Sequence, residues 1–236
     1  KQKTAYEIKE CDWSSDVCSS DLRTARDGEN ASEDALRQAG YLFFLMAEKR
    51  EAGALPLLYA LIRAPEGADC LFYGNAQEEL PRIIVSLFDG QLAPLIALAE
   101  DERADMEGRT ATFAAMAGIA LLDEAPGKPM CTAIETYLCG VARDAHPGDA
   151  AFWGGWAICA ATIGLERLRP EIDQACEDMR IDAAVFTREN FDPLFEQMRE
   201  DPSGATSLGS EILFPVEDAV EEIRAMEERI EELICP

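Results

Sequence analysis

Apolar residues recur every 38 residues along much of the chain. Each of four copies holds three apolar positions at spacing i, i+4, i+7, which is one face of an α-helix. We expect all twelve side chains to be buried, so that Ile96→Ala would destabilise the fold by about 2–4 kcal/mol. The twelve are Ala54, Leu58, Leu61, Leu92, Ile96, Ala99, Met130, Ile134, Tyr137, Leu168, Ile172 and Ala175.

An earlier helical stripe precedes each of these short helices. Pro56, Pro94 and Pro170 lie near the starts of three of the short helices, where a missing N–H costs little. One helix pair per fixed period is typical of a solenoid. The sequence therefore predicts an all-α solenoid of antiparallel helix pairs. The expected pairs are 35–46 with 55–63, 79–88 with 92–100, 106–122 with 130–143, and 150–163 with 167–179.

The chain divides into four parts. Residues 1–22 read KQKTAYEI, two further residues and CDWSSDVCSSDL, which resembles translated sequencing-adapter DNA; we expect this part to lack a stable fold. Residues 23–200 form the repeat domain and 201–215 a loop. Residues 216–236 form an acidic helix with one apolar face, which we expect to cap the stack, or to lie loosely beside it, and to shield the last repeat.

The charge of the chain narrows the classes of partner. There are 46 acidic and 21 basic residues, a formal net charge of −25. Such a surface repels nucleic acid and anionic membranes and favours a basic protein or peptide. No apolar run is long enough to span a bilayer. The cysteines after residue 22 form no CxxC pair, so we expect no metal or cofactor and a reducing cytoplasm.

No catalytic motif is present, and the candidate residues are those of a binding surface. His146 lies in a His-Pro-Gly turn. Asp69 and Tyr73 lie in the irregular joint 67–75, whose apolar residues could bind a partner or seal the stack. Glu78, Glu79 and Arg82 follow and add charge. Trp153 and Trp156 share one helix face around two glycines, which indicates either core packing or the wall of a groove.

Parts of the chain resemble two known families. DERADMEGRTATFAAMAGIAL, residues 101–121, resembles the HEAT repeat, which implies that Asp105 and Arg109 pair between neighbouring repeats. EELPRIIVSLFDGQLAPLIALAEDERAD, residues 78–105, and AFWGGW, residues 151–156, resemble a bacterial domain-of-unknown-function family numbered 1186. The second resemblance covers roughly residues 35–192 and implies no activity.

The leading hypothesis is a cytoplasmic HEAT-like scaffold that binds another protein or peptide, because solenoids present extended surfaces and rarely carry chemistry. The alternative is a small-molecule binder or enzyme with a pocket near Trp153 and Trp156. A deep apolar pocket beside the two tryptophans would favour the alternative.

Overall fold

The computed structural model of the protein describes residues 33–63, 71–72, 74–144, 146–182, 188–201 and 213–234. Within these ranges the regular secondary structure is helical, without a strand, which confirms the all-α class. Residues 1–22 and most of the expected loop lie outside the described residues. The helices are α3 (Glu33–Glu48), η2 (Ala52–Ala54), α4 (Leu55–Ile62), α6 (Ala76–Leu87), α7 (Leu92–Ala99), α8 (Met106–Leu121), α9 (Pro129–Arg143), α10 (Ala150–Thr162), η3 (Glu166–Leu168), α11 (Arg169–Glu177), α12 (Arg188–Glu200) and α14 (Ala219–Ile234).

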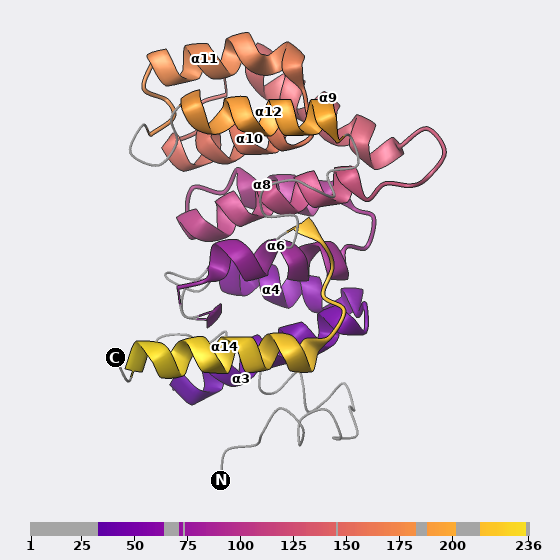
Figure 1. Ribbon diagram of the computed structural model, residues 1–236, viewed down its shortest axis with the longest axis vertical. Helices are drawn as coiled ribbons and strands as arrows, with labels where there is room; N and C mark the ends of the chain where they lie inside the picture. The colour runs from indigo at the N-terminus through magenta and orange to yellow at the C-terminus, as the bar shows by residue number, and fades with distance from the viewer. Residues whose placement is uncertain are drawn as a thin grey trace.

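The helices are stacked in layers along the long axis of the molecule (Figure 1). Helices α3, α6, α8 and α10 form a series in which each packs on the next, and α12 packs on α10. Helices α4, α7, α9 and α11 follow them in the chain as shorter or more exposed partners. Because α8 and α10 each have neighbours on two sides, they bury side chains all around the helix axis.

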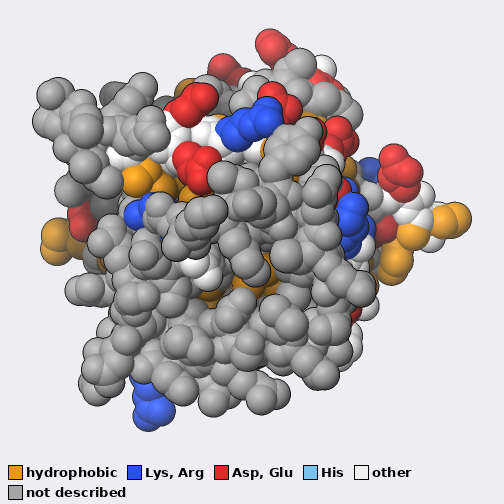
Figure 2. All heavy atoms as spheres, turned by 90° about the horizontal axis from the view of Figure 1, so that it is seen from below, with side chains coloured by type: hydrophobic (Ala, Val, Ile, Leu, Met, Phe, Trp, Pro, Cys, Tyr) orange, Lys and Arg blue, Asp and Glu red, His pale blue; other side chains and the backbone are white. Residues whose placement is uncertain are grey.

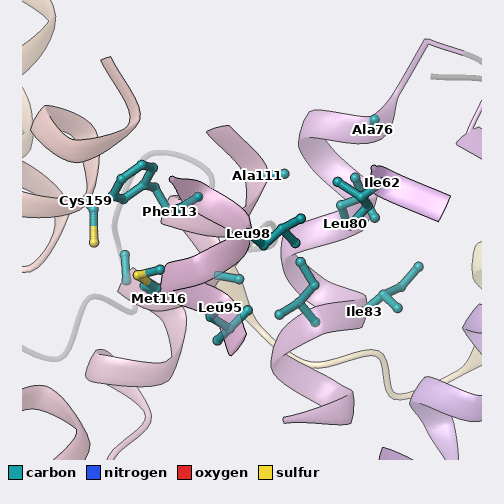
Figure 3. Packing of buried hydrophobic residues seen from close by; sticks show 14 of the residues in the cluster. Ile62, Ala76, Leu80, Ile83, Leu95, Leu98, Ala111, Phe113, Met116 and Cys159 are labelled. Atoms are coloured by element: carbon teal, nitrogen blue, oxygen red, sulfur yellow. The ribbon is translucent and has the colours of Figure 1, made fainter. Parts of the chain in front are cut away.

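One continuous apolar core runs through these layers. Figure 3 shows side chains that α4, α6, α7, α8 and α10 contribute to it, among them Ile62, Leu80, Leu98, Phe113 and Cys159. The core therefore joins successive helix pairs.

The periodic apolar residues lie mostly, but not all, in this core. Eight of the twelve are buried, and Leu92, Ile96, Met130 and Tyr137 are half-buried. In α7 the fully buried side chains are Leu95, Leu98 and Ala99, and Leu95 lies next to Ile96. Because the helix sequence LAPLIALA is apolar throughout, its periodicity does not identify the inward face.

The C-terminal helix α14 packs against α3, at the opposite end of the stack from the last repeat (Figure 1). The expectation that it shields the last repeat is therefore wrong, although α14 does cover an end of the stack. The backbone N–H of Ala219, at the start of α14, donates to Glu48 Oε2 of α3 at 3.1 Å. Among the described side chains of α14, the buried ones are Ala219, Val220, Ile223, Met226 and Ile230.

The chain reaches α14 through residues 213–218, which we call the return segment. At Gly118 of α8, an added Cβ would come within 2.8 Å of the carbonyl oxygen of Leu213. The backbone N–H of Val216 donates to Ser86 Oγ of α6 at 2.8 Å. The return segment thus contacts α8 and then α6 before α14 begins.

Figure 2 views the molecule from the end that α3 and α14 form. The acidic and basic side chains visible there are intermixed, so no single sign of charge dominates the coloured part of this face. Among the described helices, none is both long enough and apolar enough to cross a bilayer.

Candidate functional site

The charged residues of α6 are presented in two different ways. Glu78 is exposed, whereas Glu79 is only 3% exposed and Arg82 is half-buried. The guanidinium of Arg229 on α14 donates to Glu79 Oε1 at 2.6 Å. Arg82 donates through both terminal nitrogens to Glu222 of α14, with Nη1 to Oε2 at 2.8 Å. Two of the three α6 residues expected to meet a partner, Glu79 and Arg82, therefore hold α14.

Burial controls the electrostatics of Glu79. It raises the pKa of this carboxyl above its ordinary value, and the charges of Arg229 and Arg82 offset the shift only in part. Arg82 Nη1 lies 3.7 Å from Glu79 Oε2. A carboxylate in the first turn of a helix is normally solvated, so its position in the sequence does not indicate that α14 covers it.

Two further candidates, Asp69 and Tyr73, lie outside the described residues. Their neighbours Leu71 and Phe72 are 0% and 1% exposed. Phe72 packs edge-on against Phe44 of α3, with ring centroids 6.0 Å apart. The part of this joint that the structure describes thus seals the stack, which is one of the two roles that its sequence allowed.

Trp153 and Trp156 are core residues, at 1% and 0% exposed. Their rings pack edge to face at 5.2 Å, and Trp156 Nε1 donates to the backbone oxygen of Leu138 at 3.0 Å. The neighbouring glycine admits a side chain of the stack: a Cβ at Gly155 would come within 2.5 Å of the Phe113 ring. The two indoles therefore pack in the core and are not accessible to a partner or ligand.

Arg109 links two layers, but not through the expected aspartate. Asp105 caps α8 by accepting the backbone N–H groups of Glu107 and Gly108. Arg109, which is buried, donates instead to Asp149 Oδ2 at 2.6 Å. Asp149 is the N-cap of α10, in the next layer. Its position in α10 corresponds to that of Asp105 in α8.

The outward sides of α4 and α7 form an uncharged surface. Neither helix contains a charged residue over its 8 positions. A salt bridge of 3.0 Å between Arg63 and Asp101 joins their C-terminal ends. We call the outward side chains of both helices the α4–α7 face. Its exposed members are Pro56, Ala93, Pro94 and Ala97, and its half-buried ones are Leu57, Ala60, Leu92 and Ile96.

Acidic residues border the α4–α7 face. Glu51 precedes α4, Asp89 precedes α7, and Glu100 and Glu102 follow α7; all four are exposed. Asp101, between the last two, is engaged by Arg63. The sequence did contain a signal for this face: LPLLYALI and LAPLIALA carry no charge in a strongly acidic chain. The 38-residue pattern hides this signal, because it predicts that the apolar residues of both helices are buried.

The family of the chain follows from a match over most of its length. A family model described as "Protein of unknown function (DUF1186)" matches residues 22–228. The chain belongs to this family. Searches of curated proteins and of solved structures found no match. The family match ends within α14, at residue 228, and therefore extends beyond the stretch on which the sequence resemblance rests.

The described part of this family member offers little metal chemistry. No three histidine, cysteine, aspartate or glutamate side chains among its described residues are grouped so that they could hold a metal ion. His146 Nδ1 accepts the backbone N–H of Gly148, and the ring stacks on Phe152 at 4.2 Å between centroids. These contacts are those of a turn residue.

Proposed function

We propose that the protein is a HEAT-like scaffold that binds a basic, amphipathic segment of another protein on the α4–α7 face. The observation that carries the proposal is an apolar, exposed surface on two uncharged helices, bordered by carboxylates. Apolar positions would supply contact area, and the acidic border would select the charge of the partner and speed its approach.

Contacts between layers support a solenoid with a 38-residue period. Arg63 and Asp101, which form a salt bridge, are 38 residues apart. Tyr137 donates to Glu100, 37 residues earlier, at 3.2 Å. Each such pair joins one layer to the next, which is the arrangement expected of repeats that contact mainly their neighbours.

The cytoplasm is the location that we propose for this scaffold. The cysteines described in α9, α10 and α11 are free thiols. Free cysteines persist most readily in a reducing compartment.

The test measures binding of a synthetic helical peptide built from leucine and lysine by fluorescence anisotropy. We expect binding that weakens as salt rises, and an affinity reduced about tenfold by Ala97→Arg, which places a cation on the apolar face. Thr136→Arg is the matched control, because it adds the same charge at an exposed position of α9.

Circular dichroism would check that both variants fold. Equal affinities of the two variants would refute the assignment of the α4–α7 face. Equal binding of a leucine–glutamate peptide would refute the proposed charge of the partner.

A further inference from the structure

A cavity of about 300 Å³ lies between the end of α8, the start of α9, the turn after α10 and helix α12. This volume is at the small end of the range found for ligand sites. We propose that this cavity binds a small amphipathic carboxylate, with its apolar part inside and its carboxylate at Lys128. The site is separate from the α4–α7 face and does not depend on it.

The interior of the cavity suits an apolar group. Leu121, Ile163, Phe195 and Met198 line it. Phe195 is 1% exposed, and the guanidinium of Arg169 lies 5.1 Å from its ring centroid, which fixes one wall. A ligand with a short aliphatic or aromatic body would gain from burial there.

The charges at the cavity favour an anion. Arg199 and Glu166 both line it and form a salt bridge of 2.5 Å. Glu166 is also 3.6 Å from Arg169, so its negative charge is offset twice. Lys128 lines the same cavity and is exposed, and no described acidic side chain forms a salt bridge with it. The surplus charge of the lining is therefore positive, within a chain of net charge −25.

Two carboxylates near the start of α9 make other contacts. Asp123 accepts the backbone N–H groups of Met130 and Cys131, at 2.8 and 3.2 Å. Glu135 pairs with Arg167 at 2.8 Å. Neither of them forms a salt bridge with Lys128, whose ammonium group can pair with an external anion.

Cys131 provides a reporter inside the cavity. It lines the cavity and is half-buried, whereas Cys139 is half-buried on the same helix but does not line it. Burial, and then the charge of Glu135, raise the pKa of the Cys131 thiol, so alkylation has to be followed in alkaline buffer.

The experiment follows alkylation of each cysteine by N-ethylmaleimide on the full chain, with peptides quantified by mass spectrometry. Octanoate below its micellar concentration should slow alkylation of Cys131 severalfold and leave Cys139 unchanged. Octylamine, which has the same chain and the opposite charge, should protect neither. Calorimetric titration should show that Lys128→Glu weakens octanoate binding about fivefold or more.

Arg143→Glu is the matched control, because it makes the same charge change at the other end of α9, where Arg143 is exposed. It should leave octanoate affinity unchanged. An unchanged Cys131 rate with octanoate, equal protection by octylamine, or equal effects of the two variants would each overturn the proposal. Because Lys128 is exposed, Lys128→Glu should keep the fold. A loss of octanoate binding would then reflect the changed charge.

Discussion

Adjacent side chains in α7 have unlike environments, which makes them a test of the register. Leu95 is 0% exposed and Ile96 is half-buried. We expect Leu95→Ala to lower the free energy of unfolding by about 2–5 kcal/mol, because it removes a core side chain and leaves a cavity. Ile96→Ala should cost only about 1 kcal/mol, since less of its surface leaves water. Urea denaturation of both variants measures the difference.

A larger loss for Ile96→Ala than for Leu95→Ala would restore the strict 38-residue register. The sequence could not decide between these neighbours because polar residues are absent from α7. In α9, where Glu135 and Thr136 interrupt the apolar positions, the expected Ile134 is buried, although Met130 and Tyr137 are half-buried. Polar residues on the outward side of a helix help to identify its inward face.

At the scale of elements, the link between α8 and α10 depends on one half-exposed carboxylate. Burial alone would raise the pKa of Asp149, but the hydrogen bonds from Arg109 and from the backbone of Phe152 outweigh it and hold this pKa below its ordinary value. Arg109 itself is 2% exposed. The pair therefore stabilises the fold only while Asp149 is ionised.

We expect Asp149→Asn to lower the free energy of unfolding by about 1–2 kcal/mol near neutral pH, a value reduced by the 47% exposure of Asp149. Asparagine keeps the helix cap, so the change isolates the charge. Because the folded pKa is depressed, this stability is present above the unfolded pKa and disappears as pH falls through the folded one. Urea midpoints compared at neutral and acidic pH give the measurement.

Convergence of the variant and the unmodified protein in acid is the expected outcome. A difference that persists in acid would show that Asp149 acts through its backbone contacts rather than its charge. The HEAT resemblance correctly pointed to Arg109 as a link between layers. The resemblance paired Arg109 with Asp105, which lies in the same stretch of sequence. In the structure Arg109 instead reaches Asp149, the N-cap of α10 in the next layer.

At the scale of the whole molecule, the return segment ties the end of the described chain to its middle. Gly118 admits the carbonyl of Leu213, and a Cβ there would also lie 3.0 Å from Val85. We expect Gly118→Ala to lower the free energy of unfolding by about 1–3 kcal/mol through this clash. Gly140→Ala is the matched control, because its Cβ would meet only Arg143 at 3.9 Å.

The control should be neutral or stabilising by up to about 1 kcal/mol, since alanine favours a helix over glycine. Thermal unfolding of both variants measures this difference in stability. If Gly118→Ala proved as stable as Gly140→Ala, the return segment would not be packed on α8 as described.

The helical class was predictable because its signals are local: apolar spacing, prolines near helix starts and glycines between helices. The position of α14 was not. Its apolar residues, such as Ile223 and Met226, specify a face that must be buried but not which end of a stack buries it. The partners that decide the position, Glu79 and Arg82, lie about 140 residues earlier and look like ordinary surface charges in the sequence.

The contact between α14 and α3 also has a consequence during synthesis. Helix α3 ends at Glu48 and α14 begins at Ala219, about 170 residues later. At about 5–20 residues per second, a ribosome needs roughly ten to thirty seconds to make that interval. Helix α3 must therefore wait for its covering helix while the later layers emerge. A chaperone that shields α3 during this delay would release it only after α14 has left the ribosome.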